Sequence, residues 1–374
     1  MSSDAGQGRP PVLPGEFIRI ELTKRGWSQE DLAHVLGRSP ARVNQIITGK
    51  QELSPEIAIQ LQYAIGTAAD VWLQREAAYR LSLTAADVAD VKLRSRLYDF
   101  GPIKEMQKRG WLKPDAAPDE LEAEILRFYG IKSLDETPQV AGVMRKTAPL
   151  ASLSHAQRAW YFRVRNLATK MPALPFDSAK MKECRADLRK LAAYSAHVAK
   201  VPKVLAHYGV RFVIVQPLEG GKVDGVATWL AANEPVIGLS MRFERIDNFW
   251  HTLLHEAVHV EHHDESVDMD MDDEPITAKP AYEKRAVDDA ASTFVPRQEL
   301  MAFIRRYGPL YSEQVINQLA NKLKVHPGII VGQLHHLGEV SYSKFRDLLV
   351  KVRDVIAPKS LTDGWGYTVD ARFA

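Results

Sequence analysis

The sequence has little of what marks secreted and membrane proteins. Its 374 residues contain one cysteine, Cys184, which excludes an internal disulfide and is typical of a reducing compartment such as the cytosol. No apolar run approaches the roughly 20 residues that a membrane-spanning helix needs. Residues 1–14 are rich in Gly, Pro and Ser and have no apolar centre, so we expect a flexible N-terminus that is not a secretory signal. These absences predict a cytoplasmic protein without a membrane segment.

The net charge is small as well. The formal charge at pH 7 is +2, so any affinity for nucleic acid has to come from a local cluster of basic residues. Hydrophobic residues make up 45% of the chain and charged residues 26%, which are ordinary values for a folded protein and exclude wholesale disorder. The length allows two or three domains, each with a core of its own.

Signals for helix starts and ends follow one another closely in residues 15–82. Ser28 precedes a helical apolar pattern and has Asp31 three residues on, which is the arrangement of a capping box. Gly37 can end that helix with a positive φ, and Ser39 followed by Pro40 begins the next one. The apolar residues expected between these two helices are Leu32, Ala33, Leu36, Val43, Ile46 and Ile47. Two short helices joined by a glycine turn predict a helix-turn-helix within a helical bundle.

The second of these helices carries side chains suited to reading duplex DNA. Arg pairs with guanine, and Asn or Gln pairs with adenine, through two hydrogen bonds in the major groove. We therefore predict base contacts from its outward residues, Ala41, Arg42, Asn44 and Gln45. Arg38 and Lys50 are predicted phosphate ligands, and Gln29 a further backbone contact. Acidic residues elsewhere in the segment leave two alternatives open, a solvent-facing bundle and a helix-turn-helix that binds protein.

The same segment carries a family resemblance. Residues 25–33 (RGWSQEDLA), residues 36–39 (LGRS), and Gly66-Thr67 followed by Trp72-Leu73 closely resemble the Cro/C1-type (XRE) DNA-binding domain of HigA-like antitoxins. The resemblance implies a repressor or antitoxin, usually a homodimer on a palindromic operator, with a toxin or repressor protein as a candidate partner. Carried over residue by residue, its recognition helix contributes Ser39, Ala41, Arg42, Asn44 and Gln45 as DNA contacts.

Residues 83–200 are divided by prolines into short helices, which we interpret as a helical connector. Within it, Trp160, Tyr161 and Phe162 alternate with arginines, a combination that can form a nucleic-acid surface. At helical spacing the pattern is more typical of an amphipathic helix whose aromatic residues face a core, and we prefer that interpretation.

Residues 201–239 change to strand character. Residues 210–215, 223–230 and 236–239 are rich in β-branched side chains and are separated by Pro217 and by Gly220-Gly221. They predict a small antiparallel sheet, and with it a mainly α chain of the α+β class. In zinc peptidases an edge strand of such a sheet can pair with an extended substrate.

His255 and His259 belong to a His-Glu-x-x-His sequence within an apolar helical stretch. Residues four apart share one face of a helix, so both imidazoles can bind one metal ion, with Glu256 beside it as a proton acceptor. Catalytic Zn²⁺ takes three protein ligands. We predict Glu283 as the third, because it shares a helical stripe with buried small residues. The alternative for Glu283 is an exposed acid that the dipole of its helix stabilises.

Residues 201–300 resemble the ImmA/IrrE family of zinc metallopeptidases. The resemblance rests on residues 245–248, on residues 252–259 (TLLHEAVH), and on Glu283 leading into Ala290-Ala291 and residues 294–296 (FVP). It implies a zincin-like peptidase domain with His255, His259 and Glu283 as Zn²⁺ ligands and Glu256 as the catalytic residue. Residues 285–289 (RAVDD) depart from the family pattern, which more often has an acid, Ala, Asn or Asp, and then an aromatic residue.

The remaining segments carry fewer signals. We interpret the acidic run 264–274 as a solvent-exposed loop, with a metal-attracting loop as the alternative. Residues 301–358 predict a C-terminal helical region resembling that of HigA-type regulators fused to such peptidases. Its His326, His335 and His336 are more typical of helix caps or core residues, so none is assigned a role. Residues 359–374 are expected to form a loosely held tail.

Together these patterns predict a DNA-binding transcriptional regulator with a zinc-dependent endopeptidase domain that cleaves itself or a partner regulator and so relieves repression. One alternative is a non-proteolytic antitoxin or repressor whose metal site is structural or senses a ligand. The other is a peptidase whose helix-turn-helix binds a protein.

Overall fold

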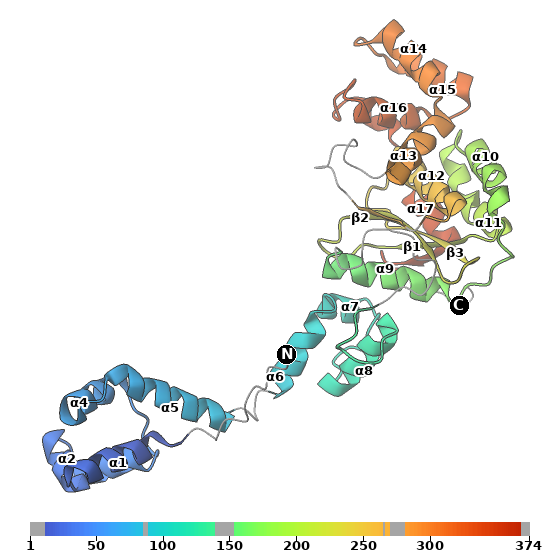
Figure 1. The fold of residues 1–374 in the computed structure, drawn as a ribbon. Helices are drawn as coiled ribbons and strands as arrows, with labels where there is room; N and C mark the ends of the chain where they lie inside the picture. The colour runs from blue at the N-terminus through green and yellow to red at the C-terminus, as the bar shows by residue number, and fades with distance from the viewer. Residues whose placement is uncertain (1–11, 85–88, 139–152, 265, 270–280, 368–374) are drawn as a thin grey trace. The chain divides into compact units, whose positions relative to one another are not determined.

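A computed structural model of the chain describes residues 12–84, 89–138, 153–264, 266–269 and 281–367. It divides into two compact units, residues 1–95 and residues 96–374 (Figure 1). In the described part of the chain, no helix combines the length and the apolar character needed to cross a membrane.

The first unit is a bundle of short helices. Ser28 begins the second helix with the predicted capping box: its Oγ accepts from the backbone N–H of Asp31 at 3.1 Å, and the Asp31 carboxylate accepts from the backbone N–H of Ser28 at 2.7 Å. Ser39 caps the third helix, which has Pro40 at its first position, as predicted. The helices are α1 (Pro14–Arg25), α2 (Gln29–Val35), α3 (Pro40–Ile47), α4 (Pro55–Ile65) and α5 (Ala69–Thr84).

The core of this bundle contains the residues predicted between α2 and α3, except that Leu36 is only partly buried, and it extends to α1, α4 and α5. Leu32 and Ala33 of α2 pack in one cluster with Val43, Ile46 and Ile47 of α3, and all are buried. Burying a side chain of the size of Val or Ile stabilises the fold by about 1.5–3 kcal/mol. Because the apolar side of α3 is committed to this core, its polar side remains for a partner.

The second unit is built on a five-stranded sheet with the strand order β4-β2-β3-β1-β5. The strands are β1 (Arg211–Val215), β2 (Val223–Trp229), β3 (Pro235–Leu239), β4 (Ser266–Met269) and β5 (Leu361–Asp363). β2 pairs antiparallel with β3 and β4, whereas β1 pairs parallel with β3 and β5. The α+β class and the first three strands are confirmed, but the sheet is mixed and not antiparallel. A short turn joins β2 to β3, which makes that pair antiparallel. β1 precedes both strands in the chain and runs in the same direction as β3.

Two helices cover the two faces of this sheet (Figure 1). α9 (His155–Ala168) lies on one face, where Trp160 Nε1 donates to the Val215 carbonyl at 2.7 Å and the Tyr161 hydroxyl lies 2.7 Å from Thr228 Oγ1. The aromatic residues of α9 are buried, which confirms that they face a core. α12 (Ile246–His262) crosses the opposite face and carries the His-Glu-x-x-His sequence.

Other helices of the second unit pack against α12 and the sheet. α13 and α16 pack against α12. In α16, His326 is a helix cap that accepts from the Gly328 N–H, and His335 is a buried core residue whose Nε2 lies 3.1 Å from the Lys344 carbonyl oxygen, as the sequence suggests. The remaining helices of the second unit are α7 (Ile103–Lys108), α8 (Pro118–Tyr129), α10 (Met181–Leu191), α11 (Val201–His207), α13 (Ala281–Phe294), α14 (Arg297–Tyr307), α15 (Glu313–Leu323), α16 (Pro327–His336) and α17 (Arg353–Ile356). α6 (Ala89–Tyr98) includes the division between the two units.

The expectation of a loosely held tail over residues 359–374 is wrong for its first part. Leu361, Thr362 and Asp363 form β5, which extends the sheet beside β1. Arg163 of α9 donates from Nε to Asp363 Oδ2 at 2.6 Å, and both side chains are largely buried. A strand of three residues is too short to show an alternating pattern, so only pairing with β1 reveals it. Residues 368–374 lie outside the described part of the chain.

Candidate metal centre and nucleic-acid interface

α12 carries its polar motif through the core of the second unit. His255 is 2% exposed, and Glu256 and His259 are fully buried. Burying a polar group without a compensating partner costs roughly 2–7 kcal/mol, depending on the reference solvent. The three side chains are therefore expected to meet partners from other elements or a ligand.

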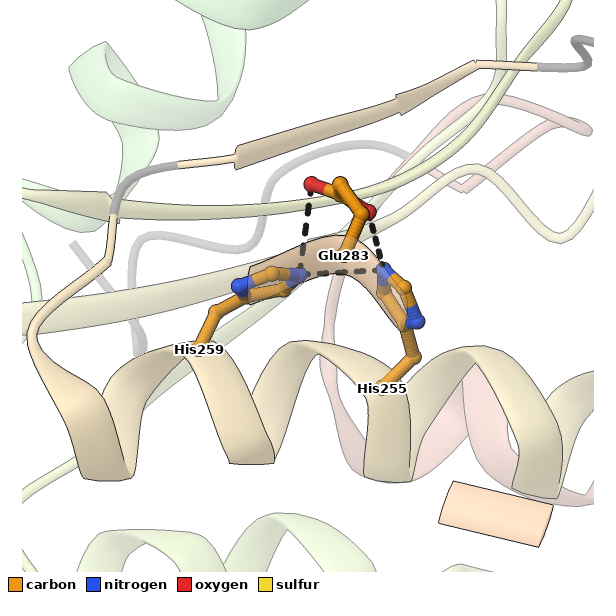
Figure 2. A group of neighbouring side chains, drawn as sticks. All are labelled: His255, His259 and Glu283. Atoms are coloured by element: carbon orange, nitrogen blue, oxygen red, sulfur yellow. Dashed lines mark hydrogen bonds and ion pairs between the residues drawn. The ribbon is translucent and has the colours of Figure 1, made fainter. Parts of the chain in front are cut away.

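A third side chain meets the two imidazoles from a separate helix. Glu283, in the first turn of α13, directs its carboxylate at both of them, as Figure 2 shows. Its Oε2 lies 3.3 Å from His255 Nε2, and its Oε1 lies 3.5 Å from His259 Nε2. The two Nε2 atoms are 3.0 Å apart, and all ligand atoms of this cluster lie within 4.8 Å of one another. The structure thus brings the three predicted metal ligands together.

The spacing of these atoms suits a zinc ion. Zn²⁺ binds imidazole nitrogen and carboxylate oxygen at about 2.0–2.2 Å in a tetrahedron, which separates neighbouring ligand atoms by about 3.3–3.6 Å. The separations of 3.3 and 3.5 Å, each to a different oxygen of the Glu283 carboxylate, fall in that range, and the 3.0 Å between the two Nε2 atoms is slightly shorter. A cluster of two imidazoles and one carboxylate is also the donor set that zinc peptidases use. The residues present therefore fit Zn²⁺.

The electrostatics of Glu283 favour the ionised carboxylate. Burial by itself would raise its pKa, but the imidazoles of His255 and His259, through hydrogen bonding and positive charge, hold the pKa well below its usual range. An ionised carboxylate is the form that binds a cation. Glu283 is therefore no ordinary exposed acid at a helix start, since its side chain is 18% exposed and faces both histidines.

Glu256 lies on the side of α12 that faces the sheet. A Cβ atom built on Gly225 of β2 would lie 2.7 Å from Glu256 Oε1 and 2.7 Å from Thr252 Cγ2, so a larger residue there would force these side chains to shift. Gly225 is not among the residues predicted from the sequence. An isolated glycine within a strand is, however, a signal for the close approach of another element.

The acidic run 264–274 is not simply a solvent-exposed loop. Residues 266–269 form β4 at the edge of the sheet, and Asp264 Oδ2 lies 3.8 Å from His259 Nδ1 and 2.6 Å from Arg285 Nη2. Sequence reasoning missed Asp264 and Arg285 because no spacing rule links either of them to His259. Residue 265 and residues 270–274 lie outside the described part of the chain.

In the first unit, α3 presents most of the predicted DNA contacts to solvent. Ala41, Arg42, Asn44, Gln45 and Lys50 are exposed, and Gln29 at the start of α2 is half-buried. All of them except Gln29 lie on or directly after α3. The fold therefore leaves this set of polar side chains open to a partner.

Two predicted contacts are already engaged within the bundle. The Ser39 hydroxyl accepts from the backbone N–H of Arg42 as the cap of α3. Arg38 donates from Nε to Gln60 Oε1 at 3.0 Å and from Nη2 to Glu56 Oε1 at 3.1 Å, and its side chain is 13% exposed. Arg38 is thus bound by side chains of α4. The positions of basic residues along the sequence do not indicate such a contact between two helices.

Comparison with known proteins agrees with this description of the first unit. Residues 18–72 match the helix-turn-helix family. Virulence-associated protein I of Dichelobacter nodosus is 33% identical over 95 residues, which span 25% of this chain and 88% of that protein. The uncharacterised HTH-type transcriptional regulator YddM of Escherichia coli K12 is 32% identical over 84 residues, 22% of this chain and 88% of YddM.

Solved structures similar to this part of the chain include the antitoxin GraA, with 29% identity, a TM-score of 0.22, and coverage of 24% of this chain and 96% of GraA. PA4674 of Pseudomonas aeruginosa, solved in complex with its operator DNA, has 32% identity, a TM-score of 0.20, and coverage of 21% and 87%. The chain belongs, through its N-terminal unit, to the XRE-type helix-turn-helix family of DNA-binding transcriptional regulators and antitoxins.

Proposed function

We propose that this chain is a DNA-binding transcriptional regulator whose second unit is a zinc-dependent endopeptidase. The observation that carries the enzymatic half is the convergence of His255, His259 and Glu283, from two separate helices, with their ligand atoms within 4.8 Å of one another. A buried glutamate directly after the first histidine adds the acid–base group that peptide hydrolysis needs.

Each residue has a distinct part in this chemistry. His255, His259 and Glu283 would hold the metal, and Zn²⁺, when bound, supplies Lewis acidity toward a peptide carbonyl and toward water. Glu256 accepts a proton from the attacking water and returns it to the amide nitrogen that leaves. Its carboxylate is enclosed between α12 and β2, so its orientation is restricted by packing against Gly225.

The two halves suggest how the chain is regulated. A protease joined to a DNA-binding domain can end repression by separating that domain from the rest of the chain. We propose that the substrate is this chain or a second copy in a homodimer on a palindromic operator, with a toxin or another repressor as a further candidate. The exposed Arg42, Asn44 and Gln45 would read the operator in the major groove.

The test of the enzymatic half uses the purified full-length chain with Zn²⁺. Cleavage of the chain and of fluorescently labelled casein is followed by gel electrophoresis and mass spectrometry, with Glu256→Gln as the matched control that retains the metal ligands. We expect fragments from the wild type, and none from Glu256→Gln or after removal of the metal by a chelator. Zinc binding without any cleavage would instead support a regulator whose metal site is structural or senses a ligand.

The DNA-binding half is tested separately with a duplex that contains the promoter of the chain's own gene. Fluorescence anisotropy at several salt concentrations should give an affinity that falls steeply with salt, because cationic side chains displace counterions from phosphates. Light scattering of the complex reports whether two chains bind. Weak binding that is equal on scrambled duplexes would point to a helix-turn-helix that binds protein.

A further inference from the structure

We infer that the outer surface of α10 and α11 is a second DNA-binding surface, which contacts phosphates of the duplex without reading its sequence. Its positive charge comes from four exposed side chains, Lys180, Lys182, Lys200 and Lys203, which we call the lysine surface. The inference extends the proposed DNA binding to the second unit, and it does not depend on the zinc site.

Positive charge is concentrated in this segment of the chain. Residues 178–207, from the start of η2 (Ser178–Lys180) to the end of α11, contain seven Lys and Arg residues and two acids. Residues 1–95, which include the helix-turn-helix, contain eleven basic and eleven acidic residues and so have no net charge. A local excess of positive charge on a chain of formal charge +2 is what attracts a polyanion such as duplex DNA.

The packing of α10 and α11 turns these lysines toward solvent. The apolar residues of both helices are buried in one core: Met181, Cys184, Leu188, Val201 and Leu205. The two helices pack against each other and lie side by side in Figure 1. Lys180 and Lys200 directly precede α10 and α11, whereas Lys182 and Lys203 lie within them. Because both helices bury one side in the same core, their exposed sides form neighbouring parts of the protein surface.

The lysine surface is free to bind an anion. Two arginines of α10 are already engaged inside the second unit: Arg185 Nη2 lies 2.8 Å from Glu261 Oε2, and Arg189 Nη2 donates to the Leu323 carbonyl at 2.6 Å. In contrast, none of the four lysine ammonium groups has a hydrogen bond or an ion pair within the part of the chain that the structure describes. These ammonium groups therefore remain available for phosphate.

The two acids of the segment reduce this charge only in part. Asp187 is engaged by Lys190 Nζ at 2.7 Å and by the Tyr208 hydroxyl at 2.8 Å. Glu183 is exposed and is the one unpaired acid of residues 178–207, all of which the structure describes. Four free ammonium groups against one free carboxylate leave a positive surface. Lysine binds phosphate as a point charge and lacks the planar fork with which arginine reads guanine, so such a surface favours phosphates over bases.

The test measures the DNA affinity of the full-length chain by fluorescence anisotropy at several salt concentrations. The duplexes are the promoter of the chain's own gene and a scrambled sequence of the same length. Each phosphate contact contributes about 0.9 to the slope of log affinity against log salt, so four contacts contribute about 3–4. Between about 50 and 200 mM salt, these four contacts account for a loss of affinity on the order of 100-fold.

A variant that combines Lys180→Gln, Lys182→Gln, Lys200→Gln and Lys203→Gln should therefore have a slope shallower by about 3–4 on both duplexes. The ratio of its promoter affinity to its scrambled affinity should equal that of the wild type, because phosphate contacts carry no sequence information. Arginine at the same four positions keeps the charge and should preserve binding. The matched control changes four other exposed lysines of the second unit to Gln, and it should keep the wild-type slope: Lys104, Lys108, Lys132 and Lys344.

A wild-type slope in the variant with four Gln substitutions, or an equal loss in the control, would overturn the lysine surface as a DNA contact. Cosedimentation with phosphatidylserine vesicles tests an anionic membrane as the partner. If the variant loses vesicle binding and still binds DNA like the wild type, the surface belongs to a membrane contact and the inference is wrong. Equal wild-type affinity for the two duplexes would refute operator reading by α3, yet a shallower slope in the variant would still support the lysine surface.

Discussion

One added methyl group at Gly225 should separate peptidase activity from metal binding. The Cβ of an alanine there would lie 2.7 Å from both Glu256 Oε1 and Thr252 Cγ2, whereas ordinary contact begins at 3.4 Å. The Glu256 carboxylate therefore has to move by about 0.7 Å (3.4 − 2.7), and it is not a metal ligand in the proposed site. Since a displacement of about 1 Å can cost on the order of 100-fold in rate, we expect kcat/KM to fall about 10- to 100-fold.

Gly238 on the neighbouring strand provides the matched control. A Cβ there would lie 2.6 Å from Val164 Cγ1 of α9 and 2.9 Å from Val226 Cγ1, on the face of the sheet opposite to Glu256. Both substitutions should overpack the core and lower the free energy of unfolding by about 1–3 kcal/mol, as measured in guanidinium chloride. Only Gly225→Ala should reduce casein cleavage, and neither should change Zn²⁺ affinity.

Two results would refute this reasoning about Glu256. The first is a folded Gly225→Ala chain that cleaves casein as fast as the wild type. The second is an equal loss of activity in both glycine variants, which would assign the effect to general overpacking. The first result would mean that the carboxylate facing β2 is not the proton acceptor in the position seen here, and the second that its displacement is not the cause of the lost activity.

Three further predictions follow from individual contacts. Arg42→Ala should weaken operator binding, measured by fluorescence anisotropy, by about 1–3 kcal/mol. Arg38→Ala should weaken it less, because the Arg38 guanidinium already donates hydrogen bonds within the bundle. Equal losses would contradict the assignment of base contact to Arg42 and of a structural role to Arg38. Asp363→Ala should lower the free energy of unfolding in urea by about 1–3 kcal/mol, because Arg163 loses its carboxylate partner, and no change would contradict a structural role for β5. Burial raises the pKa of the Cys184 thiol to about 12, so a thiol reagent should label it only on unfolding. The stability that this neutral thiol contributes should be lost as the pH rises above the unfolded value of about 8.5, and rapid labelling of the folded chain would contradict its burial.

Features that depend on neighbours within one or two turns could be predicted from the sequence. The caps at Ser28 and Ser39 involve residues three apart, and His255 and His259 share a helix face because they are four apart. Glu283 is predicted as the third metal ligand because it shares a helical stripe with buried small residues. Its meeting with the two histidines, however, depends on α13 packing against α12.

Features that depend on distant segments could not be predicted in the same way. Nothing in the pattern of residues 361–363 indicates that they pair with β1, and the parallel direction of β1 beside β3 follows from the order in which the strands enter the sheet. Likewise, the sequence predicts that Arg38 binds a phosphate. In the structure its guanidinium donates hydrogen bonds to Glu56 and Gln60 of α4.

By itself, the sequence therefore determined the helix-turn-helix and the His-Glu-x-x-His helix, because hydrophobic periodicity and capping act over a few residues. The tertiary structure decided the third side chain at the candidate metal centre, the glycine that makes room for Glu256, and the placement of Asp264 beside His259. Those contacts arise where α12, α13 and β2 pack together, and packing between separate elements has no fixed spacing along the chain.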